Sequence, residues 1–180
     1  DGCEANCRRI ELLGSYDGAL TRDVSVVGNI AYVADWPAGL LLVDVSNPAS
    51  PTYLGRYGNW IDDVSVVGNI AYVADYNLGL VIVNVANPAS PTYLGRYEIP
   101  GGVNSVSVVG NTAYLTGGHS SLVLVDVSNP LSPTLIVSYG NWAFEDVSVV
   151  GNIAYIAAGN SLVVLDVSNP SSPTLIGSYN

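Results

Sequence analysis

Acidic and aromatic side chains are the residues of this sequence that could do chemistry, and they gather in segments that vary between otherwise similar stretches of chain. Carboxylates beside aromatic rings suit the binding of a sugar, and Trp and Tyr also suit protein interfaces. Two facing carboxylates are what a glycosidase needs, and carboxylate oxygens bind Ca²⁺. The nearest acidic candidates are Asp62, Asp63, Glu145 and Asp146.

Several reactions lack the residues that they require. The acidic candidates form no contiguous calcium-loop motif, and two cysteines with one distant histidine, His119, are too few ligands for zinc. A single histidine gives no Ser-His-Asp spacing, and there is no lysine for covalent catalysis. We therefore predict no catalytic residue, no metal site, no cofactor and no enzyme activity.

The candidate ligand face is the aromatic part of the variable segments. Trp60 and Trp142 occupy equivalent Gly-Asn-Trp triplets, a repetition that favours packing between repeats, whereas Trp36 has no counterpart and is expected to be exposed. An aromatic and acidic face of this kind predicts a glycan or a protein as its ligand. The face comprises Trp36, Trp60, Tyr76, His119, Trp142 and Phe144.

Composition and charge limit the class of protein. The 180 residues are 49% hydrophobic and 11% charged, which excludes a disordered acidic tail, and they are enough for one domain with a core. No apolar run approaches the roughly 18 residues of a membrane helix. The formal net charge of −10 makes nucleic acid an improbable partner, because such a surface repels phosphates.

The sequence contains no methionine, so Asp1 is not a translation start. Removal of a signal peptide is the ordinary route to such a chain, and it predicts an extracellular or cell-surface location. The two cysteines, Cys3 and Cys7, fit an oxidising compartment and are expected to form an internal disulfide, with bridges between molecules as the alternative. They lie in an N-terminal segment, 1–9, that precedes the repeats.

Internal repetition decides the predicted fold. A Gly-Asn pair, an Asn-Pro pair and a Pro-Thr pair recur in step, which divides residues 10–180 into four repeats of about 41 residues. The approximate repeats are 17–57, 58–97, 98–139 and 140–180.

Each repeat reads as four short antiparallel strands, which in the first repeat are 23–27, 30–34, 40–45 and 52–57. Gly-Asn between apolar runs predicts a hairpin turn, and the two prolines after the third strand predict another turn. The third strand is apolar without alternation, so both of its faces must be covered. A four-stranded sheet packed between copies of itself is the blade of a β-propeller, so we predict an all-β, four-blade propeller domain.

The third strand and the turn after it carry a resemblance to a known family. The segments LLLVDVSNPASPTYLGRY, LVIVNVANPASPTYLGRY, LVLVDVSNPLSPTLIVSY and LVVLDVSNPSSPTLIGSY resemble the LVIVD repeat, and the resemblance covers residues 10–180. It implies a propeller in an exported or cell-surface protein and supplies no catalytic residue. Asp44, Asp126 and Asp166 match the last letter of the motif, and Asn84 replaces it. We expect these four to bond to the backbone of the following turn.

The chain also holds one strand more than four blades need. Residues 10–16 align with the fourth strand of each repeat, yet the last repeat already has its own fourth strand at 174–179. The surplus strand would protect an edge of its own ring, replace the C-terminal strand, or pair with a neighbouring molecule. The predicted assembly residues are Ile10, Leu12, Leu13, Tyr16, Leu175, Ile176 and Tyr179.

Two functions remain open at the level of the sequence. The first is an extracellular structural or interaction module that assembles with itself, head to tail, through exchange of terminal strands into a filament or a larger ring. The second is a monomeric propeller that binds a glycan or a protein on the face formed by the variable loops.

Overall fold

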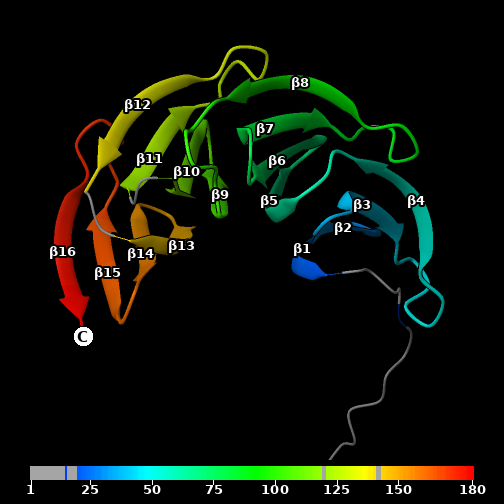
Figure 1. Ribbon diagram of the computed structural model, residues 1–180, viewed down its shortest axis with the longest axis horizontal. Coiled ribbons are helices and arrows are strands. Elements are labelled where there is room, and N and C mark those ends of the chain that lie inside the picture. The colour runs from blue at the N-terminus through cyan, green and yellow to red at the C-terminus, as the bar shows by residue number, and fades with distance from the viewer. Residues whose placement is uncertain (1–14, 16–19, 119–120, 141–142) are drawn as a thin grey trace, which may run out of the picture.

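The computed structural model describes residues 15, 20–118, 121–140 and 143–180. In these residues sixteen strands form four antiparallel sheets, and every sheet takes its four strands in chain order (Figure 1). We number the sheets as blades. Blade 1 holds β1 (Thr21–Val27), β2 (Ile30–Asp35), β3 (Gly39–Asp44) and β4 (Thr52–Tyr57), and blade 2 holds β5 (Ile61–Val67), β6 (Ile70–Asp75), β7 (Gly79–Asn84) and β8 (Thr92–Tyr97). Blade 3 holds β9 (Ser105–Val109), β10 (Thr112–Gly117), β11 (Ser121–Asp126) and β12 (Thr134–Tyr139), and blade 4 holds β13 (Phe144–Val150), β14 (Ile153–Ala158), β15 (Ser161–Asp166) and β16 (Thr174–Tyr179).

The four strands of the first repeat lie where the sequence predicts them, with four boundaries shifted by one or two residues. The second strand ends at Asp35 instead of Ala34, and the third begins at Gly39 instead of Leu40. The first strand of blade 1 begins at Thr21 instead of Asp23, because a β-bulge between these residues extends its pairing with β2. The third strand ends at Asp44, because the N–H of Val45 turns to the carbonyl of Asn29 at 2.8 Å. That bond ties the turn after the third strand to the Gly-Asn turn.

The turns are held by the side chains that the repeat motif predicts. The Asp44 carboxylate accepts the N–H of Ser46 at 2.8 Å, and the same bond recurs from Asn84, Asp126 and Asp166 in the other blades. The predicted turn-bonding role of these four residues is confirmed. Because Asn84 makes the bond as well as the aspartates do, a hydrogen-bond acceptor is sufficient at this position and a charge is not required.

The core consists of three apolar clusters, each lying between two successive blades. In the first cluster Leu40 and Leu42 of β3 pack against Val64, Val73 and other residues of blade 2. Blade 2 packs against blade 3 in the second cluster, and blade 3 packs against blade 4 in the third. Both faces of blades 2 and 3 are therefore covered. The third strands of blades 2 and 3 are apolar on both sides because both sides are buried, as predicted. In blade 4 no described sheet covers one of the two sides, and Leu162 of β15 is 42% exposed.

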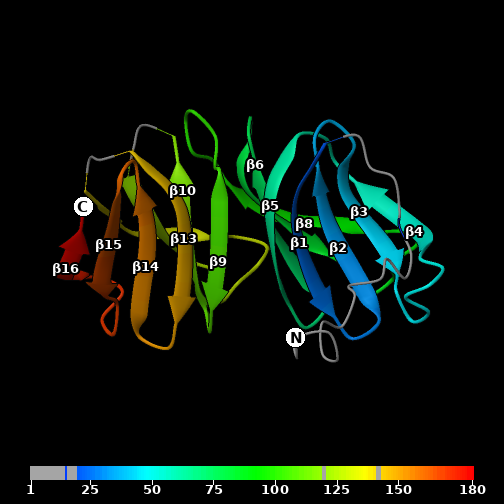
Figure 2. The same cartoon turned by 90° about the horizontal axis from the view of Figure 1, so that it is seen from below.

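The blades follow one another along an arc that stays open between blade 1 and blade 4 (Figure 1). The first strands of the blades, β1, β5, β9 and β13, lie on the concave side of the arc and are called the inner strands here (Figures 1 and 2). The fourth strands lie on the convex side. Within the described residues, no sheet covers the outward face of blade 1 or of blade 4.

Candidate functional site

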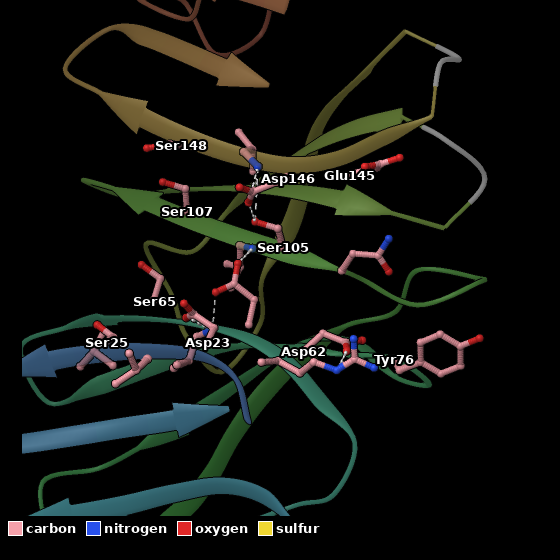
Figure 3. A pocket seen from close by; sticks show the side chains of 18 of the residues that line it. Asp23, Ser25, Asp62, Ser65, Tyr76, Ser105, Ser107, Glu145, Asp146 and Ser148 are labelled. Carbon is pink, nitrogen blue, oxygen red and sulfur yellow. Dashed lines mark hydrogen bonds and ion pairs between the residues drawn. The ribbon is translucent and has the colours of Figure 1, made fainter. Parts of the chain in front are cut away.

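A cavity of about 980 Å³ lies along the inner strands of all four blades. Each blade contributes the same three positions, on its inner strand or, for Asn104, directly before it, so the side chains fall into three rows across the strands (Figure 3). The charged row is Arg22, Asp62, Asn104 and Glu145, the linking row is Asp23, Asp63, Ser105 and Asp146, and the hydroxyl row is Ser25, Ser65, Ser107 and Ser148.

The charged row owes its position to local backbone irregularities. In blades 1, 2 and 4 the pairing of the inner strand with its neighbour shifts register across Arg22, Asp62 and Glu145. Bulges bend a strand and re-aim its side chains, which explains how these residues line the cavity beside the linking row. Arg22 Nε lies 3.7 Å from Asp62 Oδ1, and its guanidinium carbon lies 5.8 Å from the centre of the Trp36 ring.

The linking row joins each blade to the next. In blades 1 to 3 its side chain accepts a hydrogen bond from a backbone N–H on the inner strand of the following blade. The pairs are Val64 N–H to Asp23 at 3.2 Å, Val106 N–H to Asp63 at 2.8 Å and Val147 N–H to Ser105 at 3.4 Å. The same contact is therefore repeated at each of the three junctions between successive blades.

Asp63 has the most unusual electrostatic environment in the cavity. Burial, together with the hydrogen bond with Asp23, raises the pKa of this carboxyl to about 7, against the opposing effect of the bonds from Val106 and Ser105. Burial likewise raises the pKa of Asp62, although the Arg22 guanidinium beside it opposes the shift. The Asp63 carboxyl, which lies beside the Asp23 carboxyl, therefore gains or loses its proton near neutral pH.

The hydroxyl row is the part of the cavity that the sequence prediction missed. One serine per blade lies along the inner strands (Figure 3). In blade 3 the Ser107 hydroxyl accepts the N–H of Val149 from blade 4 at 3.2 Å. The signal was present in the repeated Ser two residues after the linking row. A residue that recurs in every repeat inside a strand is typical of a structural position, and the sequence does not show that this strand faces a cavity.

The predicted ligand face divides into separate places. Trp36 and Tyr76 line the large cavity, where Trp36 is half-buried instead of exposed as expected. Trp60 is exposed and lines a smaller cavity of about 430 Å³ with Tyr57 and Tyr93, so for Trp60 the expected packing between blades is wrong. The N–H of Trp36 donates to the carbonyl of Leu20, and the N–H of Tyr76 donates to that of Trp60. In blades 1 and 2 the segment before the first strand therefore meets the loop between the second and third strands at one end of the blade.

Phe144 is a correction to the predicted face. It lies in the apolar cluster between blades 3 and 4 with 3% of its surface exposed, because it is the first residue of β13 and points into the core instead of the solvent. His119 and Trp142 lie outside the described residues.

The predicted assembly residues divide in the same way. Ile10, Leu12, Leu13 and Tyr16 lie outside the described residues, as do Cys3 and Cys7 of the predicted disulfide. Leu175, Ile176 and Tyr179 belong to β16, which pairs with β15 in blade 4, and all three side chains are exposed.

The cavity is a polar surface without a preformed metal cluster in the described part of the chain. No group of three or more His, Cys, Asp or Glu side chains in that part is placed to hold a metal ion. No helix in the described residues is long and apolar enough to cross a membrane. What the rows do offer are carboxylate and hydroxyl oxygens that accept and donate hydrogen bonds, with two aromatic rings at the rim.

Four-stranded antiparallel sheets arranged radially around a shared cavity define a repeat protein of the β-propeller type. The chain belongs to the LVIVD repeat family, whose model matches residues 18–59, 61–99, 100–141 and 144–180. The resemblance seen in the third-strand motifs is thereby confirmed.

Solved structures of low sequence identity share this fold. The arc is similar to the computationally designed Ika8 protein (TM-score 0.69, 11% identity, 88% of this chain on 48% of that one) and to the designed Ika4 protein (0.64, 11%, 94% on 99%). It is also similar to the β-propeller domain of Cps50 (Swd1) from Myceliophteria thermophila (0.68, 12%, 89% on 58%). The chain thus spans about half the length of the Ika8 chain. No curated protein matches the sequence.

Proposed function

We propose that this chain is a non-catalytic structural and interaction module that assembles with copies of itself outside the cell. The open arc supports the proposal, because blade 1 and blade 4 each present an apolar face that no described blade covers. Contiguous exposed apolar surface on a folded protein marks an interaction site. The two faces lie at opposite ends of the arc, so a contact between them joins molecules head to tail.

The location in the proposal rests on the family and the cysteines. LVIVD repeats are typical of exported proteins. Cys3 and Cys7 also fit an oxidising compartment. Strand exchange between molecules is one mechanism of assembly. For it, residues 10–16 are the segment to test, since the C-terminal strand β16 already completes blade 4.

The mass of the full chain in solution tests the proposal. Light scattering on the non-reduced protein across a range of concentrations is expected to give multiples of the 18.7 kDa chain mass. A mass of one chain at every concentration overturns the proposal of self-assembly.

The cavity supports a second candidate function, the binding of a glycan. Its carboxylate and hydroxyl rows match the hydroxyl groups of a sugar, and Trp36 and Tyr76 at the rim supply aromatic faces for the sugar ring.

A further inference from the structure

The outward face of blade 1 is a copy of surfaces that are buried elsewhere in the chain. Val24 on β1 is 56% exposed, whereas its counterparts in the later blades are 4–5% exposed because each packs against the preceding blade. Val33 is half-buried, although its counterpart Val73 is fully buried. Blade 1 therefore carries the surface that receives a preceding blade, and that blade is not among the described residues.

Blade 4 presents the complementary surface. Tyr155 on β14 and Leu162 on β15 are each 42% exposed. Their counterparts in the other blades are 0–5% exposed and pack into the cluster shared with the following blade: Tyr32, Tyr72 and Tyr114 for the tyrosine, and Leu40, Leu80 and Leu122 for the leucine. Blades 1 and 4 thus present the two halves of an interface that occurs three times between successive blades.

The charges at the two ends are also complementary. Within the arc Arg22 of blade 1 pairs with Asp62 of blade 2 in the charged row. The last member of the row, Glu145 in blade 4, would meet Arg22 of a following blade 1 in the same relation. In the linking row, Asp146 would accept the N–H of Val24, as Asp23 accepts the N–H of Val64.

The outermost strand of blade 4 leaves room for a neighbour. A Cβ built on Gly55 of β4 would lie 2.4 Å from the carbonyl oxygen of Pro88, and one on Gly95 of β8 would lie 2.3 Å from that of Pro130. These distances show how closely a fourth strand approaches the proline turn of the next blade. Gly177 holds the same position in β16 and has nothing within 4 Å. The proline turn of a following blade fits that space.

We propose that the outward face of blade 4 packs on the outward face of blade 1 of a second copy, so that two copies close one eight-blade ring around the cavity. This inference rests on the proposed self-assembly and names its interface. Propellers of four-stranded blades typically have four to eight blades. The four described blades leave the arc open, and two such arcs together hold eight blades, which lies within that range.

Charged substitutions on the two faces test the interface in the full chain. Leu162→Asp and Val24→Asp each place a carboxylate in a contact that is apolar at the junctions within the chain. We expect each to weaken dimerisation by at least about 30-fold, as for a central interface residue. Leu131→Asp is the control, because its side chain is 68% exposed in the turn between β11 and β12 of blade 3, away from the two outward faces. Analytical ultracentrifugation is expected to give two-chain particles for the wild type and the control.

A charge exchange tests the register of the contact. Glu145→Arg alone and Arg22→Glu alone each place like charges at both junctions of a two-copy ring, whereas a mixed ring of the two variants has opposite charges at both. Native mass spectrometry of the mixture is therefore expected to show the mixed dimer in excess over the statistical half. A statistical distribution contradicts the Glu145–Arg22 contact and with it the proposed register.

The remaining outcomes separate this inference from the proposal on which it rests. If the wild type is monomeric, both fail. If assembly survives the face variants but is lost on deletion of residues 1–16, strand exchange is the mechanism and the face contact is wrong. Particles larger than two chains that the face variants dissociate overturn the closed ring.

Discussion

At the scale of single residues, the linking row shows why the ionised form of one carboxyl in this protein is unfavourable. Asp63 accepts a bond from the Val106 N–H, and it also lies beside Asp23, the same position in the preceding blade. Repetition of an aspartate in successive blades brings two carboxyls together inside a partly dry cavity. Blade 3 avoids this repetition with Ser105, whose hydroxyl donates to Asp146 at 2.7 Å.

The raised pKa of Asp63 makes the stability of the fold depend on pH. An aspartate in the unfolded chain titrates near 3.8, and Asp63 in the fold titrates at about 7. As the pH rises from about 4 to 7, the unfolded chain loses this proton first, so the free energy of unfolding falls, by up to about 4 kcal/mol, and then levels off above pH 7. We expect Asp63→Asn to remove this decline, since the amide oxygen still accepts the Val106 N–H.

Urea unfolding of the wild type and of Asp63→Asn at several pH values checks this expectation. The difference between them is informative because all other titrations are shared. Asp44→Asn is the control: that carboxyl lies at an exposed turn, the Ser46 hydrogen bonds lower its pKa, and Asn84 fills the same position in blade 2. A wild type and an Asp63→Asn variant with parallel pH profiles would show that the Asp63 proton is not bound more tightly in the fold.

At the scale of elements, the convex side of the arc is held by close backbone approaches. The fourth strand of blades 1 and 2 lies against the proline turn of the next blade through Gly55 and Gly95. Blade 3 has Val137 at this position and packs it against the third cluster. The need for glycine therefore belongs to individual junctions and not to the repeat as a whole.

Replacing either of two equivalent glycines by alanine distinguishes a fourth strand that packs against the next blade from one that has no neighbour. We expect Gly55→Ala to lower the free energy of unfolding by about 1–3 kcal/mol, because the added Cβ meets the Pro88 carbonyl and the strand must shift. Gly177→Ala is expected to change it by less than about 1 kcal/mol, because nothing lies near Gly177 in one chain. Both are measured by urea unfolding in a Leu162→Asp background, which removes the contribution of assembly. Equal losses would show that the clash is not with the next blade.

At the scale of the whole molecule, the cavity exists because four blades place their inner strands side by side. No single repeat contains the site, since its charged, linking and hydroxyl rows each take one residue from every blade. The same arrangement separates the half-buried Trp36 from the exposed Trp60. Trp36 lies at the cavity, and Trp60 lines the smaller cavity beside Tyr57 and Tyr93.

These two tryptophans provide a matched test of glycan binding. If a glycan is held in the cavity, a glycan array probed with Trp36→Ala should lose binding by about tenfold or more, which corresponds to the loss of one aromatic stack. Trp60→Ala should retain it. Loss of binding in Trp60→Ala with retention in Trp36→Ala would move the ligand to the smaller cavity, and absence of any bound glycan in the wild type would remove this candidate function.

The fold was predictable from the sequence because its signals are local and repeated four times. Gly-Asn pairs mark hairpins, paired prolines end the third strand, and third strands without alternation require cover on both faces. The candidate site was predictable only in part. Trp36 and Tyr76 were placed at the loop end correctly, while Phe144 was misplaced because an aromatic residue next to a variable loop looks the same in sequence whether it points outward or into the core.

The amino-acid sequence by itself determined the four blades, the turns between their strands and the family, because each depends on residues close together in the chain. The tertiary structure decided what happens between blades. It brought Asp23 and Asp63 together from positions 40 residues apart, aligned three rows of side chains along one cavity, and left the outer faces of blades 1 and 4 uncovered. Identical repeat positions become core, cavity or exposed interface according to which blade stands beside them, and only packing in three dimensions assigns that neighbour.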